Sequence, residues 1–296
     1  MRVVISGGTG FIGSKLIPLL QKRGDEIFVF TRDATRSRSK ELNDVTFIEW
    51  TPLSSGKWQQ TIDGADVVIH LAGKPVVDKR WSASVKREIL QSRAVTTKLI
   101  VEGILQSENP PAVFISASGV GYYGEVSAPT DEKGIGGEGF LAEVCKEWEA
   151  PNSLLQDSNT RSVILRIGVV LGDQGALPKM QLNMRFFSGF GNDSQFLSWI
   201  HWKDACEGIL YTIDNPQVVG PVNLTAPNPE TMRGFTVALA KVMRRPFWIP
   251  IPEFMIRLAL GEMADAVLIG QNAIPKKLLD CGYSFQYPQL EEALIN

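Results

Sequence analysis

Arg2-Val-Val-Ile-Ser6 runs directly into Gly7-Gly-Thr-Gly-Phe-Ile-Gly13, and this join determines the fold of the chain. The short apolar run is typical of a strand buried on both faces of a parallel sheet. Apolar residues spaced at i, i+4, i+7 and i+8 from Ile12 to Leu20 then predict an amphipathic helix. Ile27-Phe-Val-Phe30 predicts a second strand. Strand, glycine loop, helix and strand therefore follow one another within about 30 residues, as in a βαβ unit.

The glycine spacing in this setting predicts a dinucleotide-binding loop. Gly7 allows the tight turn, Gly10 lets the backbone approach a pyrophosphate, and Gly13 lets the helix pack closely on the strand. The phosphates would meet the free N–H groups and the positive dipole end of the helix. We expect an α/β fold of the Rossmann type, with a doubly wound parallel sheet, and we count Thr9 among the loop contacts.

The tip of the second strand favours NADP(H) over NAD. Thr31 ends this strand, and four basic residues come at or after the tip: Arg32, Arg36, Arg38 and Lys40. A cation here accepts the 2′-phosphate of NADP, whereas an acidic residue would bind the free ribose hydroxyl of NAD. Asp33 would take the second role if the strand ran further, and a solvated basic loop is the third interpretation.

Asp66-Val-Val-Ile-His-Leu-Ala-Gly73 predicts another buried strand, which ends in small residues. Leu71, Ala72 and Gly73 would pass close to the ribose and nicotinamide side of the cofactor. We interpret His70, inside this apolar run, as a core histidine rather than a catalyst. Residues 81–101 predict a long helix, from which Arg93 could reach inward to the cofactor.

Composition excludes several classes of protein. Lys and Arg number 30 and Asp and Glu 32, so the formal net charge of −2 does not suit a nucleic-acid binder. The three cysteines, 61 and 75 residues apart, fit neither a disulfide framework nor a zinc site. No apolar run is long enough for a membrane span. We expect no metal and no membrane partner, and a cytoplasmic location, or an organellar one if a targeting peptide was removed.

Taken together, the motifs resemble those of the extended short-chain dehydrogenase/reductases, and more narrowly of the atypical, YfcH-like epimerase branch with its SulA-type proteins. The resemblance spans nearly the whole chain and rests on the segments GGTGFIG, DVVIHLAG, FISASGVGYYG, LRIGVVLG, WIHWKDA, KRWSASVKREILQSR, FLAEVCKEWE and GQNAIPKKLLDCGYSF.

This resemblance implies an NADP(H)-binding Rossmann domain over residues 1–171 plus 196–225. A smaller, mostly helical C-terminal lobe over 172–195 plus 226–296 would lie on the substrate side. It also implies a small-molecule substrate of unknown identity and suggests a homodimer. The family's cofactor contacts fall on Gly7, Gly10, Phe11, Ile12, Gly13, Thr31, Arg32, Leu71, Ala72 and Gly73.

The sequence departs from the family at the catalytic pair. The superfamily uses a tyrosine and, four residues on, a lysine whose charge lowers the phenol pKa. Phe140 and Val144 stand at these places, and no Tyr-x-x-x-Lys occurs in the chain. Ser118, or Ser116 in another register, occupies the position of the catalytic serine.

Three accounts of this departure stay open. A relocated acid is the first, with Tyr122 or Tyr123 as the leading candidates and Glu143 or Cys145 behind them. Hydride transfer without a strong protein acid is the second. The third is a cofactor-binding regulatory protein, for example one linked to cell division, in which efficient turnover was lost.

Two further features concern the substrate side. The segment Ser188-Gly-Phe-Gly-Asn-Asp-Ser194 is shorter than the glycine-rich stretch usual in the family. His201, in Trp-Ile-His-Trp-Lys-Asp204, is expected to make a structural contact that closes the site rather than to act as a general base.

Overall fold

The computed structural model describes residues 1–34, 44–175, 177–178, 180, 194–244 and 252–296. Its centre is a seven-stranded sheet in the order β11-β7-β5-β4-β1-β2-β3, and every neighbouring pair is parallel. The strands are β1 (Arg2–Ser6), β2 (Glu26–Thr31), β3 (Val45–Glu49), β4 (Val67–His70), β5 (Val113–Gly119), β7 (Arg161–Ile167) and β11 (Gly220–Leu224).

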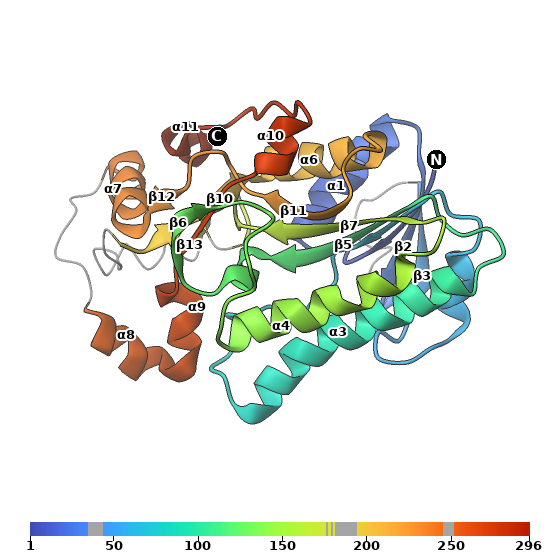
Figure 1. Cartoon of the computed structure of the whole chain (residues 1–296), viewed down its shortest axis with the longest axis horizontal. Helices are drawn as coiled ribbons and strands as arrows, with labels where there is room; N and C mark the ends of the chain where they lie inside the picture. Colours follow the sequence, from blue (N-terminus) through green and yellow to red (C-terminus); the bar gives the residue numbers. More distant parts are fainter. Residues whose placement is uncertain (35–43, 176, 179, 181–193, 245–251) are drawn as a thin grey trace.

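Helices cover both faces of this sheet (Figure 1). Helices α1 (Phe11–Lys22) and α6 (Trp202–Asp214) lie on one face, and α3 (Ala83–Leu105) and α4 (Phe140–Glu149) lie on the other. The predicted Rossmann-type, doubly wound parallel sheet is therefore confirmed.

Successive residues of β1 serve opposite faces, because side chains alternate along a strand. Val3 and Ile5 pack in the apolar cluster that contains α1 and α6, and Val4 packs in the cluster that contains α3. All three are fully buried. This two-sided burial explains why the strand is an unbroken apolar run instead of an alternating one.

The C-terminal portion is mostly helical, as expected. Its helices are α7 (Met232–Val242), α8 (Glu253–Leu260), α9 (Asp265–Leu268), α10 (Lys276–Asp280) and α11 (Leu290–Ile295). Three small two-stranded sheets complete it: β8 (Val169–Leu171) with β10 (Trp199–His201), β9 (Phe196–Leu197) with β12 (Glu230–Thr231), and β6 (Val126–Thr130) with β13 (Gln271–Ala273).

The pairing of β6 with β13 joins a segment that precedes α4 to one near the end of the chain. The N-terminal and C-terminal portions of the chain are thus interleaved beyond the carboxyl ends of the sheet strands (Figure 1). The domain boundaries expected from the sequence stay a prediction.

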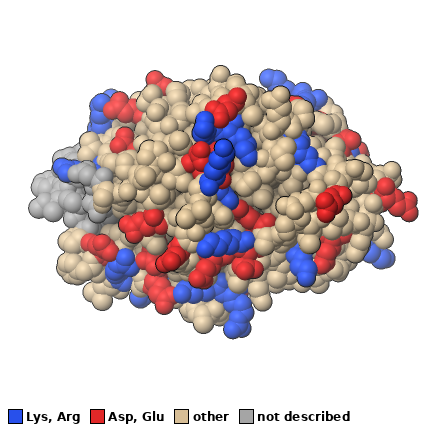
Figure 2. Space-filling model, viewed as in Figure 1, with Lys and Arg blue, Asp and Glu red and all other residues tan. Residues whose placement is uncertain are grey.

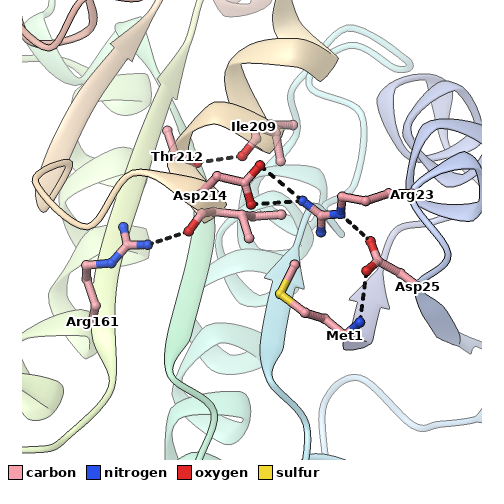
Figure 3. A network of polar contacts seen from close by, with 8 residues as sticks. Met1, Arg23, Asp25, Arg161, Ile209, Thr212 and Asp214 are labelled. Carbon is pink, nitrogen blue, oxygen red and sulfur yellow. Dashed lines mark hydrogen bonds and ion pairs between the residues drawn. The ribbon is translucent and has the colours of Figure 1, made fainter.

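A charged network ties the elements together at the amino ends of the strands (Figure 3). Arg23, at the end of α1, donates to Asp25 at 2.6 Å and to Asp214, at the end of α6, at 3.1 Å. The N-terminal ammonium of Met1 donates to Asp25 at 3.0 Å. This network holds α1 and α6 on their face of the sheet, at the end away from the glycine loop.

Acidic and basic side chains are interleaved over the face of the molecule seen in Figure 2. This agrees with the near-zero net charge. Within the described residues, no helix combines the length and the apolar character needed to cross a membrane.

Candidate functional site

A cleft of about 770 Å³ opens at the carboxyl ends of β1, β2 and β4. Ligands bind at this edge in open α/β sheets, where the strand order reverses. The cleft is lined by Gly7, Thr9, Gly10, Phe30, Thr31, Arg32, Asp33, Trp50, Pro52, Leu53, Leu71, Ala72, Gly73, Lys74, Pro75, Glu88, Gln91 and Ser92.

The glycine loop is shaped for a close approach by a ligand. Gly7 has φ +75°, which side chains disfavour, and its carbonyl accepts from the Gly10 N–H at 2.9 Å. A Cβ on Gly13 would lie 2.4 Å from that carbonyl oxygen, so only glycine fits there. Helix α1 begins at Phe11, and its N-cap residue, Gly10, has no side chain to cap the first turn. The N–H groups at the start of α1, next to this glycine-rich cradle, fit the pyrophosphate of a dinucleotide.

The tip of β2 brings Thr31, Arg32 and Asp33 to the cleft. The Asp33 N–H donates to the Thr31 hydroxyl at 3.3 Å, which forms a local turn. Arg32 and Asp33 are both exposed. Both candidate determinants of cofactor choice are therefore accessible from the cleft. Three other basic residues of the prediction, Arg36, Arg38 and Lys40, lie outside the described residues.

An aromatic cluster that was not expected from the sequence forms the adjacent wall. The Phe30 ring stacks on Trp50 at 5.2 Å between centroids, and Trp58 meets both rings edge-on. Phe30 and Trp50 line the cleft together with Leu53. The two tryptophans in an otherwise polar stretch, Trp50 and Trp58, were the available signal for this wall.

The inner wall follows β4. Leu71, Ala72 and Gly73 line the cleft where they were expected. His70 is fully buried, and its Nδ1 lies 2.5 Å from the Ser6 hydroxyl. Burial, assisted by the charge of Arg93, lowers the pKa of His70 to about 3. His70 is thus a neutral core residue, although its Nε2 has no hydrogen-bond partner among the described residues.

Ser118 takes part in a buried ion-pair network. Its hydroxyl donates to Oε1 of Glu149 at 2.7 Å. Arg166 donates to the same carboxylate through Nε at 2.9 Å and NH2 at 2.8 Å. Burial alone would lower the pKa of Arg166, but the hydrogen bond and charge of Glu149 raise it above its ordinary value. Ser118 is not among the residues that line the cleft.

The two tyrosines after β5 belong to the same network. The Tyr123 hydroxyl donates to the Asn223 side-chain oxygen at 2.7 Å and accepts from Arg166 at 3.0 Å. Burial raises the pKa of Tyr123, although Arg166 and Asn223 oppose that shift. The Arg166 guanidinium carbon lies 3.4 Å from the ring centroid of Tyr122. In this arrangement Tyr123 is a weaker acid than an ordinary phenol, the opposite of the usual tyrosine-lysine pair.

Arg166 is the residue of this network that sequence reasoning missed. It lies inside an otherwise apolar strand segment, Val163-Ile-Leu-Arg-Ile167. An arginine in such a run is rarely buried without an acidic partner, so its position was the available signal.

Helix α4 carries the residues that replace the usual pair. Phe140 packs edge-on against Trp81, with centroids 4.8 Å apart, and Val144 is buried. Burial raises the pKa of the Cys145 thiol to about 11, and Glu143 is exposed. Ser116 is fully buried opposite His70 in the sheet. None of these five residues lines the cleft.

His201 packs against the C-terminal segment, and its expected role in closing the site stays a prediction. Its ring centroid lies 4.0 Å from that of Tyr287, and burial lowers its pKa to about 4. Nearby, the Asp204 carboxylate accepts from the backbone N–H groups of Gln286 and Tyr287 at 2.7 and 2.9 Å. These two hydrogen bonds fix the C-terminal segment at Gln286 and Tyr287 on the first turn of α6. The shortened segment is described only at Ser194, since residues 188–193 lie outside the described part of the chain.

With the cleft and its neighbourhood defined, comparison with known proteins identifies the family. The model of the NAD dependent epimerase/dehydratase family matches residues 3–224. The chain belongs to this family. A second model, for a domain of unknown function, DUF1731, matches residues 251–296.

Curated relatives cover essentially the whole chain. The epimerase family protein YfhF of Bacillus subtilis (strain 168) is 38% identical over 299 residues, which are 99% of this chain and 97% of the relative. The chloroplastic SDR39U1 homolog of Arabidopsis thaliana is 36% identical, over 99% of this chain and 86% of the relative. These matches confirm the resemblance to the atypical epimerase branch. The location expected from the sequence stays a prediction.

A solved structure agrees closely with the fold. The human epimerase family protein SDR39U1 (isoform2), solved with NADPH, is 32% identical and has a TM-score of 0.87, with 100% of this chain and 98% of that chain covered. A UDP-glucuronic acid 4-epimerase from Bacillus cereus, at 18% identity and a TM-score of 0.76, shares the fold.

Proposed function

We propose that this protein is an NADP(H)-dependent oxidoreductase of the epimerase type, with a small-molecule substrate held between the cleft and the C-terminal portion. The observation that carries the proposal is the glycine cradle at the start of α1 with Arg32 beside it at the tip of β2. NADPH in the related human structure supports the choice of cofactor.

The cofactor would use two groups of residues. Gly7, Thr9, Gly10, Phe11, Ile12 and Gly13 would hold the pyrophosphate on the loop and the first turn of α1. Thr31 and Arg32 would bind the ribose and its 2′-phosphate, and Leu71, Ala72 and Gly73 would lie along the nicotinamide ribose. The bound cofactor would supply or accept a hydride. The chain itself would orient the cofactor and exclude water from the inner wall.

A second candidate function is a cofactor-binding regulatory protein. Two side chains favour this function. Phe140 stands at the usual acid position and has no proton to give. Burial raises the pKa of Tyr123, which makes it a poorer acid. The relocated-acid hypothesis keeps Tyr122 and Tyr123 as candidates. The hydroxyl of Ser118 is engaged in a hydrogen bond to Glu149, so in this hypothesis Ser118 would position the network and would not donate a proton itself.

Turnover separates the two functions. NADPH oxidation is followed with a panel of carbonyl compounds and nucleotide sugars, after NADPH binding has been measured alone. We expect tight NADPH binding and oxidation with at least one carbonyl compound. Tight binding without oxidation by any member of the panel would favour the regulatory function. Failure to bind NADPH at all would overturn both.

A further inference from the structure

A hollow of about 900 Å³, separate from the cleft, lies over β7 and β11 on the face of the sheet that carries α4. Val163 and Leu165 of β7 pack in the apolar cluster that contains α6, on the opposite face. Because side chains alternate along a strand, Ser162, Ile164 and Arg166 face the hollow, and all three line it. The hollow and the cleft share no lining residue, and β5 lies between them in the sheet.

The ionised side chains around this hollow have a positive balance. Lys146, Arg161 and Arg166 line it as cations, and Glu149 is the one carboxylate among the described residues that line it. Arg166 already holds Glu149 through hydrogen bonds of 2.9 and 2.8 Å. Three positive charges less one negative charge leave a balance of +2, whereas the whole chain carries −2. A positive hollow on a negative protein raises the local concentration of anions.

Lys146 and Tyr122 converge at one end of the hollow. A Cβ on Gly136 would lie 2.6 Å from Cε of Lys146 and 3.2 Å from the hydroxyl oxygen of Tyr122, so both side chains reach the same point. The Lys146 ammonium, which has three donors, donates to the Gly137 carbonyl at 2.6 Å and has no carboxylate partner among the described residues. The Tyr122 hydroxyl makes no hydrogen bond to a described residue. Unused N–H and O–H donors thus stand side by side, as an anion requires.

The wall formed by β7 and by the turn after α4 offers hydrogen-bond acceptors. The Ser162 hydroxyl donates to the side-chain oxygen of Asn152 at 2.9 Å, and the Ser153 hydroxyl donates to the Ala150 carbonyl at 2.8 Å. A hydroxyl whose hydrogen is already used keeps its lone pairs and can only accept. Gln156, on the same wall, has a carboxamide without a hydrogen bond to a described residue. Such a wall is complementary to a ligand that carries several hydroxyl groups.

We propose that this hollow is a binding site for a sugar phosphate. The phosphate would accept from the Lys146 ammonium and the Tyr122 hydroxyl, since phosphate oxygens are strong acceptors. The sugar hydroxyls would donate to Ser153 and Ser162. From Lys146 to Ser153 the chain rises about 10–12 Å along α4 and the turn after it, a span that a monosaccharide phosphate with a hydrogen bond at each end covers. The site does not depend on the proposed function, because none of these four residues lines the cleft.

The test follows the 31P line widths of glucose 6-phosphate and ribose 5-phosphate with the full-length protein, to which NADPH is added so that the cleft is filled. Glucose and inorganic phosphate are the competitors, since each carries one half of the ligand. We expect the protein to broaden both sugar phosphate signals and to bind each competitor about tenfold more weakly, because each makes only part of the contacts. No broadening of either signal, or inorganic phosphate binding as tightly as the sugar phosphates, would overturn the assignment.

Three variants at exposed positions, which should all fold, locate the site. Lys146→Gln removes the charge and should weaken the binding of both sugar phosphates about tenfold. Ser153→Ala should weaken it about threefold and leave the binding of inorganic phosphate unchanged. Lys98→Gln removes an exposed ammonium from α3 and should match the wild type. Wild-type binding by Lys146→Gln, or equal losses in Lys146→Gln and Lys98→Gln, would overturn the assignment.

Discussion

Ser118 and Glu149 are joined by a 2.7 Å hydrogen bond, so this serine is engaged with the carboxylate that also compensates Arg166. The network connects the end of β5 to the end of α4 and to the end of β7. It stabilises the fold where these three elements meet.

Removing the carboxylate should therefore destabilise the protein strongly. Glu149→Ala leaves the guanidinium of Arg166 buried without its anion, and we expect a loss of about 3–5 kcal/mol in the free energy of unfolding. Urea denaturation measures this. Glu147→Ala, at an exposed position on the same helix, should stay within about 0.5 kcal/mol of the wild type. Equal effects of the two variants would show that the network contributes little.

Gly13→Ala should abolish NADPH binding and destabilise α1, because the new Cβ would lie 2.4 Å from the Gly7 carbonyl oxygen. Gly24→Ala provides the control at the other end of the helix. Its Cβ would meet open space, so only the φ of +84° costs stability, about 1–2 kcal/mol, with NADPH affinity unchanged. NADPH fluorescence titration distinguishes the two, and an alanine at residue 13 that leaves NADPH affinity intact would contradict the assigned loop.

Acid should weaken the fold through the buried histidines. The folded-state pKa of His70 is about 3, below its ordinary value of 6.5, so between these pH values the unfolded chain binds a proton that the native state does not. Stability from this group is complete above pH 6.5 and is lost as the pH falls toward 3, at up to about 1.4 kcal/mol per pH unit. His201, with a pKa of about 4, acts in the same direction.

Urea denaturation at pH 7, 6 and 5 measures this slope. His70→Gln should lose less stability on acidification than the wild type, even if it is less stable at pH 7. An unchanged slope in that variant would argue against a neutral, buried His70.

Asp204→Ala should release the C-terminal segment from α6. The variant loses the acceptors of the Gln286 and Tyr287 N–H groups, and charged hydrogen bonds contribute about 1.5–3 kcal/mol each. We expect faster proteolysis after residue 280 and a lower melting temperature. Asp280→Ala, whose exposed carboxylate pairs only with Lys276 among the described residues, is the control. Equal proteolysis of both variants would show that the hydrogen bonds to Asp204 do not hold the C-terminal segment.

Local patterns predicted three strands of the sheet and the glycine loop. The apolar runs at β1, β2 and β4 and the glycine spacing before α1 carry their information within a few residues. The helix expected over 81–101 is α3, Ala83–Leu105.

The contacts between distant residues could not be predicted in this way. The bond from Ser118 to Glu149 spans 31 positions and that from Tyr123 to Asn223 spans 100, so both depend on tertiary packing. The sequence does not distinguish a serine at a strand end with a free hydroxyl from one whose hydroxyl is hydrogen-bonded. The packing of Arg93 over the indole of Trp148 is likewise set by tertiary contacts and not by the pattern of α3.

The most direct test of the account compares NADPH and NADH dissociation constants for the wild type and Arg32→Ala, with Arg87→Ala as a surface control. Arg32 would contact only the 2′-phosphate, so the variant should bind NADPH about ten- to a hundredfold more weakly and NADH as before. The control should match the wild type for both cofactors. Unchanged NADPH affinity in Arg32→Ala, or an equal loss for both cofactors, would contradict the assignment of this cleft to NADP(H).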